Sequence, residues 1–177
     1  MQYKNIIDKY KHMNKSAVKN GIVFFGTDWL FDIPIAEFSN DNGVEAAVHN
    51  RSIKGLKLKD AENVLDCCVC DLNPIKVFIN IGENDIKSSV FDINAFQEQY
   101  EWLLYNIHSK SKAKIHILSI VDDKYVNANS ILKQLSEKYG CEYIDIRDCK
   151  TSPWILFSKI RFFLRCKPVS FCDVMAM

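Results

Sequence analysis

The chain has 177 residues, of which 48% are hydrophobic and 25% are charged, and its formal net charge is +1. This composition is that of an ordinary globular protein, which excludes a disordered chain, a collagen-like repeat and a small disulfide-rich scaffold. The length predicts one domain over residues 1–177, with a helical lead-in over 1–20 and a C-terminal segment over 151–177.

Charge and apolar patterning exclude several kinds of partner. The balance of 23 basic and 22 acidic residues gives no basic surface for nucleic acid. No apolar run is long enough for a membrane span, and residues 1–15 lack the apolar core of a signal peptide. The odd number of cysteines, seven, favours free thiols in a reducing cytoplasm. Neighbouring cysteines at 67, 68 and 70 diverge on a helix, so we expect no metal cluster there. We also expect no cofactor and no other metal site.

Short apolar runs alternate with longer amphipathic segments along the chain. The nearly continuous Val, Ile, Phe and Leu of these runs is typical of strands covered on both faces, as in parallel sheets. The runs predict five strands, over residues 22–25, 44–48, 76–81, 114–120 and 142–146.

The segments between the strands predict helices. Phe96, Tyr100, Leu103, Leu104 and Ile107 recur at spacings of three and four, with Asp92 or Asn94 as the cap. The same pattern over 131–139 precedes Gly140, and residues 58–68 give a weaker signal. We therefore predict a three-layer α/β/α sandwich around a flavodoxin-like, five-stranded parallel sheet.

The C-terminal run over residues 154–166 is apolar with interleaved basic residues. We expect a helix that packs its apolar side on the sheet and keeps its charges in water. A helix that binds a membrane surface or a partner is the alternative.

Three short polar loops follow the first three predicted strands. In an open parallel sheet, ligands bind beyond the carboxyl ends of the strands, where the strand order reverses. We therefore expect a common site at the loops Gly26-Thr27-Asp28-Trp29, 50–55 (NRSIKG) and Gly82-Glu83-Asn84-Asp85.

The second and third loops resemble blocks II and III of the SGNH (GDSL) hydrolase family. Block III is Gly-x-Asn-Asp, which residues 82–85 match fully. Block II is Asn-Arg-Gly-x-x-Gly, and Ser52 stands in place of its first Gly. The order of the blocks after successive strands also fits the family.

Blocks I and V of the family have degenerate counterparts. Block I is Gly-Asp-Ser, and this chain reads Gly26-Thr27-Asp28. Block V is Asp-x-x-His, and its nearest counterpart begins at Asp173 and places Ala176 at the histidine position. The resemblance extends from about residue 21 to the C-terminus.

The resemblance implies an esterase or acylhydrolase of small acyl or acetyl esters, including those of sugars. A serine at position 28 would attack the ester, and a histidine at position 176, oriented by Asp173, would take its proton. The Ser52 N–H and the Asn84 amide would hold the oxyanion. The resemblance places further binding residues at Gly26, Thr27, Trp29, Gly82, Glu83 and Asp85.

This chain lacks the nucleophile and the base at those positions. The Asp28 carboxylate only accepts hydrogen bonds and would repel a developing oxyanion. Loss of either group in a serine protease costs on the order of 10⁶ in turnover. The sequence therefore predicts a hydrolase-like pseudoenzyme with little or no serine esterase activity. The alternative is a non-catalytic domain that binds a partner or a ligand, such as a small ester or a carbohydrate.

Two catalytic alternatives remain open. Thr27 could act as the nucleophile with His49 as a substitute base, or Asp28 could itself attack the ester. His116 falls inside a predicted strand and is expected in the core.

Structural roles and cation binding are further alternatives for the acidic and aromatic loop residues. A hard cation such as Mg²⁺ prefers oxygen ligands, here Asp28, Glu83, Asp85 and Asp173. Asp85 could instead hold Asn84 in position. Core packing is expected for Trp29 and Phe31.

Overall fold

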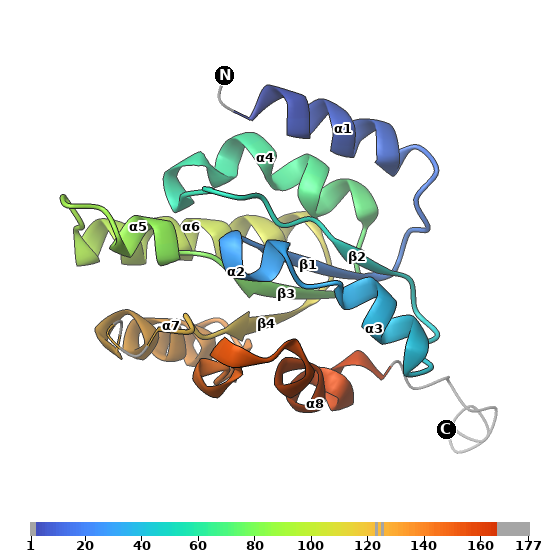
Figure 1. Ribbon diagram of the computed structural model, residues 1–177. Helices are drawn as coiled ribbons and strands as arrows, with labels where there is room; N and C mark the ends of the chain where they lie inside the picture. The colour runs from blue at the N-terminus through green and yellow to red at the C-terminus, as the bar shows by residue number, and fades with distance from the viewer. Residues whose placement is uncertain (1–2, 123, 125, 166–177) are drawn as a thin grey trace, which may run out of the picture.

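The computed structural model describes residues 3–122, 124 and 126–165. Five strands alternate with helices along this part of the chain (Figure 1). The strands are β1 (Ile22–Gly26), β2 (Val48–Asn50), β3 (Lys76–Asn80), β4 (Lys114–Leu118) and β5 (Glu142–Ile144). The helices are α1 (Lys4–Asn14), α2 (Asp28–Phe31), α3 (Ile35–Asp41), α4 (Ala61–Cys68), α5 (Glu83–Ile86), α6 (Ile93–Lys110), α7 (Val126–Lys138) and α8 (Pro153–Leu164).

The strands form one parallel sheet in the order β2-β1-β3-β4-β5, which confirms the predicted fold. The strand order reverses between β1 and β3, because the chain goes from β1 outward to β2 and then returns across β1 to β3. In such sheets, the carboxyl ends of the strands beside the reversal form the place where ligands bind.

Two apolar cores lie on opposite faces of the sheet and make the three layers. Alternate residues of β1 point to opposite faces, so Val23 and Phe25 lie in one core, and Ile22 and Phe24 lie in the other. Helices α1, α4, α6 and α7 contribute to the first core, and α2, α3 and α8 contribute to the second. Helix α1 packs on α4, outside the layer that touches the sheet (Figure 1).

Most predicted elements appear where the apolar pattern placed them. The predicted second strand over 44–48 is wrong except at Val48, because the three residues that pair with β1 are Val48–Asn50. These residues lie at the sheet edge with one neighbouring strand, so they carry little of the apolar signal that marks a buried strand. Val44 and Ala46 instead pack as half-buried side chains beside the second core.

The helical predictions are confirmed at their caps. The Asp92 carboxylate accepts hydrogen bonds from the N–H groups of Asn94 and Ala95, which begins α6. Gly140 follows α7 with φ +64°, the left-handed backbone that ends many helices. His116 is 1% exposed, and its ring makes tilted contacts with the rings of Phe78 and Phe163, as expected of a core residue.

Helix α8 covers the second core, as the C-terminal apolar run predicts. Leu156, Ile160 and Leu164 are buried against the sheet, while Trp154 and Phe162 are exposed. Within the described residues, no helix combines the length and the apolar character that crossing a membrane requires.

A substitution at Gly82, at the start of α5, would show how closely the structure is packed there. The φ of Gly82 is +119°, and a Cβ there would lie 2.7 Å from the Phe96 ring. We predict that Gly82→Ala lowers the free energy of unfolding by about 2–4 kcal/mol, because it adds overpacking to backbone strain. Gly43 has φ +69° with open space around its Cβ position, so Gly43→Ala should cost only about 1 kcal/mol. Urea denaturation measures both, and equal losses would contradict the packing around α5.

Candidate functional site

Backbone pairing along β1 brings the three predicted loops together. The Thr27 N–H donates to the Asn80 carbonyl at 3.1 Å, which continues the β1–β3 ladder past the strand end. The Ile53 N–H donates to the Gly26 carbonyl at 3.0 Å, which ties the loop after β2 to the same turn. The turn after β1 is therefore held between the loops after β2 and β3.

The Asp28 carboxylate is the centre of this junction. Its Oδ2 atom accepts hydrogen bonds from Thr27 Oγ1 at 2.6 Å, from Asn84 Nδ2 at 2.6 Å and from the Gly55 N–H at 3.0 Å. The donors come from all three loops. One anionic oxygen thus occupies a cradle of converging donors, the arrangement that an oxyanion hole offers to a transition state.

Thr27 links the two other side chains of this cradle. Its hydroxyl donates to Asp28 and accepts a hydrogen bond from Asn84 Nδ2 at 2.6 Å. The residue is only 1% exposed, so its hydroxyl faces the network and not the solvent. Thr27 therefore helps to orient Asp28 and Asn84.

The backbone donor from the second loop differs from the expected one. The predicted donor, the Ser52 N–H, points into its own turn, where it donates to Asn50 Oδ1 at 3.1 Å. The N–H that reaches Asp28 belongs to Gly55, whose φ of +72° turns its amide toward the site. The signal was present in the sequence, because Gly55 matches the second Gly of block II.

Asn50 is a positioning residue that the sequence reasoning missed. Its Nδ2 atom donates to the Leu30 carbonyl at 2.9 Å and to the Ile33 carbonyl at 3.2 Å. Together with its bond from Ser52, these contacts fasten the loop after β2 to the end of α2. Helix α2 begins at Asp28, so Asn50 helps to fix the position of the carboxylate.

Asp85, Glu83 and Trp29 lie around the junction with partners of their own. Both Asp85 oxygens accept a hydrogen bond from the Leu58 N–H at 3.1 Å, so Asp85 anchors the next stretch of the second loop. Glu83, the first residue of α5, forms an ion pair with Lys87, which follows the helix. Trp29 is half-buried against the second core, as expected.

The core prediction for Phe31 is wrong. The residue is 39% exposed, and the Lys54 ammonium lies 5.0 Å from its ring centre. Helix α2 is only one turn long, and it buries Leu30 against the sheet and leaves the next side chain outside.

The two aspartates at this edge have opposite pKa shifts. Partial burial alone would raise the pKa of Asp28, but the hydrogen bonds from Thr27, Asn84 and Gly55 outweigh it and lower that pKa to about 2. Burial raises the pKa of Asp85 to about 6, against the opposing hydrogen bond from Leu58 and the nearby charge of Lys57. Asp28 is therefore a permanent anion at neutral pH.

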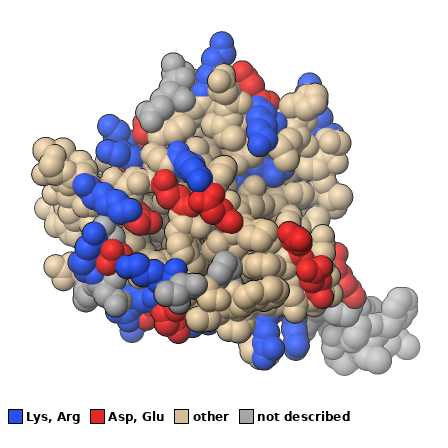
Figure 2. All heavy atoms as spheres, in the orientation of Figure 1, with Lys and Arg blue, Asp and Glu red and all other residues tan. Residues whose placement is uncertain are grey.

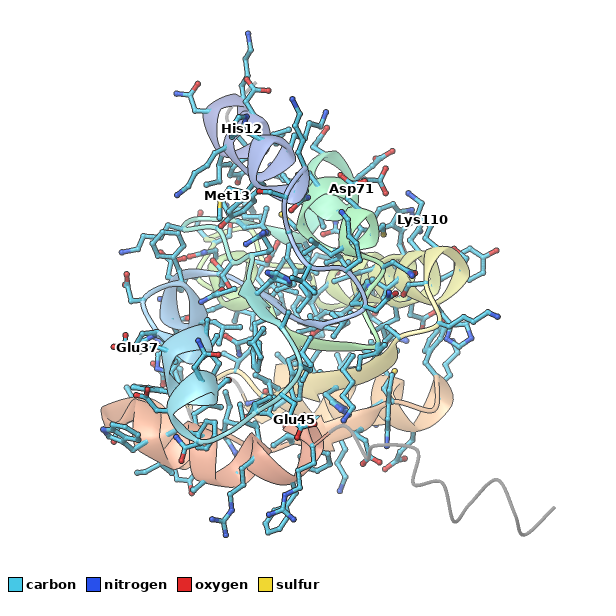
Figure 3. The ribbon with its side chains drawn as sticks, turned by 90° about the vertical axis from the view of Figure 1, so that its right-hand side faces the viewer. His12, Met13, Glu37, Glu45, Asp71 and Lys110 are labelled. Carbon is cyan, nitrogen blue, oxygen red and sulfur yellow. The ribbon has the colours of Figure 1, made fainter. Side chains whose placement is uncertain are left out.

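Two other predicted arrangements do not form in the described part of the chain. No three His, Cys, Asp or Glu side chains gather there as a cation site. His49, the proposed substitute base, directs Nε2 to the Val18 carbonyl at 2.9 Å. His12 lies on the outer helix α1 (Figure 3), and Asp173 and Ala176 fall outside the described residues.

The raised pKa of Asp85 predicts that this residue makes the stability of the protein depend on pH. The folded state keeps the proton between about pH 4 and pH 6, so this carboxyl makes the protein less stable as the pH rises through that window. Asp85→Asn keeps an acceptor for Leu58 and cannot ionise. We predict that the unfolding free energy of Asp85→Asn minus that of the wild type increases from pH 4 to pH 7. Asp41→Asn, at an exposed position on α3, controls for the lost charge, and an equal pH response in both variants would refute the assignment.

Comparisons with known proteins agree on the fold. No protein-family model and no curated protein matches the chain. A GDSL-like lipase from Bacteroides thetaiotaomicron superposes with a TM-score of 0.74 at 14% identity, over 89% of this chain and 96% of that one. A Streptococcus pneumoniae protein whose name refers to platelet activating factor gives 0.71 at 20% identity, over 92% of each chain.

An acetyl xylan esterase variant from Geobacillus stearothermophilus is more distant. Its TM-score is 0.61 at 13% identity, over 75% of this chain and 79% of that one. These structural similarities agree with the motifs in the sequence. The strand order of the sheet and the cradle after β1 agree with them too. The chain has the fold of the SGNH hydrolases, the structural group of GDSL-like lipases, acylhydrolases and acetyl xylan esterases.

Proposed function

We propose that this protein keeps the SGNH scaffold without serine-type ester hydrolysis and uses the carboxyl edge of the sheet to bind a ligand. The observation that carries the proposal is the contact set of Asp28, whose Oδ2 atom accepts hydrogen bonds from Thr27, Asn84 and Gly55. An ester oxyanion would need the same donors, and it would meet a fixed negative charge where the cradle is already filled.

Catalysis by Thr27 has little support. A threonine nucleophile needs a base and access to substrate. The hydroxyl of Thr27 is buried, and the carboxylate beside it has a pKa of about 2, too low for an effective general base at neutral pH.

Asp28 itself is a poor candidate for nucleophile. Three hydrogen bonds hold one of its oxygens, and they lower its basicity together with its pKa. An attack would have to break this network, because the donors stabilise the free carboxylate more than an ester formed on it. The network supports a binding or structural role for Asp28.

The ligand class follows from the charge of the site and from the structural relatives. A permanent carboxylate disfavours anionic ligands, so we propose an uncharged one, either a carbohydrate or a small acyl or acetyl ester. The names of the relatives include acetyl xylan esterases, which supports the carbohydrate side of this proposal.

We also propose a reducing compartment, the cytoplasm. The five cysteines among the described residues are all free thiols, which supports the choice. They are Cys67, Cys68, Cys70, Cys141 and Cys149.

Esterase chemistry can be measured directly. We predict that the wild-type protein hydrolyses p-nitrophenyl acetate no faster than Asp28→Ala and is not labelled by a fluorophosphonate probe. Both results follow from the absence of an accessible, activated hydroxyl at the cradle. Wild-type turnover that exceeds that of Asp28→Ala would identify Asp28 as a nucleophile and contradict the proposal, as would covalent labelling.

A double variant tests whether esterase activity can be introduced at this site. Asp28→Ser empties the cradle and restores a hydroxyl, and Ala176→His adds a base where we propose that block V lies. A positioned base contributes about 10²–10⁴ in rate, so the double variant should exceed Asp28→Ser alone at least 100-fold. If a folded double variant, checked by circular dichroism, stays at the level of the single one, block V does not lie at Asp173–Ala176.

A further inference from the structure

A surface groove begins beside the site and continues along α6. The first hollow, of about 170 Å³, is lined by Asp85 from the site, by Lys57 and Lys59, and by α6 residues that include Gln99. The second, of about 320 Å³, is lined by Lys59, Gln99 and Trp102, among others. Lys59 and Gln99 line both hollows, which places the hollows side by side along α6, and we refer to the pair of hollows as the groove.

The groove lies between helix α6 and a 3-10 turn. Ala95, Gln99 and Trp102 are spaced by four and three residues, so they form one stripe along α6. The stripe is about 10 Å long at 1.5 Å per residue. The opposite wall is the 3-10 turn Leu58–Asp60, which packs against α6 and whose first N–H is held by Asp85. A groove of this length that is open to solvent suits an extended ligand more than a compact one.

The charges along the groove disfavour an anionic ligand. Lys57 and Lys59 are interleaved with acidic side chains, Asp85 and Asp92 at one end and Glu62 and Glu98 at the other. The face of the molecule in Figure 2 likewise mixes both signs. The carboxylates outnumber the lysines four to two, which disfavours an anion. Hydroxyl groups, which both donate and accept, match such a mixture of donors and acceptors.

Trp102 adds an apolar surface at the far end of the groove. The residue is 37% exposed, and Glu62, Glu98 and Gln99 lie beside it in the lining. An indole offers a flat apolar face, and the polar side chains around it offer hydrogen bonds. Sugar rings have this same combination, with an apolar C–H face and a rim of hydroxyls.

We propose that this groove is a binding site for an uncharged oligosaccharide, with Trp102 as its stacking platform and Lys59 and Gln99 as hydrogen-bonding residues. The proposal rests on the proposed function, because the first hollow is lined by Asp85, the residue that follows Asn84 of the Asp28 cradle.

The three tryptophans allow a direct test by NMR. Trp29, Trp102 and Trp154 each give one indole N–H signal, assigned with single Trp→Phe variants. We titrate the ¹⁵N-labelled protein with xylotetraose and with cellotetraose, both uncharged. The Trp102 signal should shift and saturate with at least one of them. Trp154, which is 59% exposed on α8 and lies in neither hollow, is the built-in control and should not move.

Variants separate the groove from nonspecific binding. Trp102→Ala and, independently, Lys59→Ala should weaken binding at least tenfold, measured by calorimetry, while Trp154→Ala leaves it unchanged. No shift with either sugar, an equal shift of Trp154, or binding only of an anionic tetragalacturonate would overturn the proposal. Fluorophosphonate labelling tests the site at Asp28 and does not involve the groove. A labelled protein would therefore contradict the proposed function, whereas absent sugar binding would contradict the groove proposal.

Discussion

The structure around the site depends on the parallel pairing of β1 with β2 on one side and β3 on the other. Parallel strands end at the same edge, so the turns that follow them are brought into contact whatever their side chains are. The hydrogen bonds of Thr27 and Ile53 continue this pairing beyond the strands and set the positions of the loops. The strand pairing thus positions the cradle around Asp28, and the side chains of the loops then determine its chemistry.

Within that frame, Asp28 determines the chemistry of the edge. A carboxylate at position 28 supplies from within the chain the negative charge that the cradle would stabilise in a transition state. The donors lower its pKa, and the same donors become unavailable to a substrate. Asp85, the residue that follows Asn84, has no such cradle, and burial raises its pKa. The two aspartates thus differ in pKa because their surroundings differ.

The sequence predicted the sheet, its layers and the convergence of three loops, because buried strands carry continuous apolar runs and parallel order fixes where they end. It misplaced the edge strand, since Val48–Asn50 has only one neighbour and little apolar signal. It also chose Ser52 and not Gly55 as the backbone donor. That choice depends on the φ of a single residue, and only the folded loop reveals where each N–H points. The groove along α6 was not predicted, because its walls come from segments about 40 residues apart in the chain.

The central claim, that Asp28 is an anion held by donors from all three loops, is tested most directly by NMR titration of its side-chain carboxyl carbon. We expect a pKa of about 2 in the wild-type protein, well below the ordinary 3.8. We also expect an upward shift in Asn84→Ala, which removes one of the three donors. A wild-type pKa at or above 3.8, unchanged by Asn84→Ala, would contradict this claim.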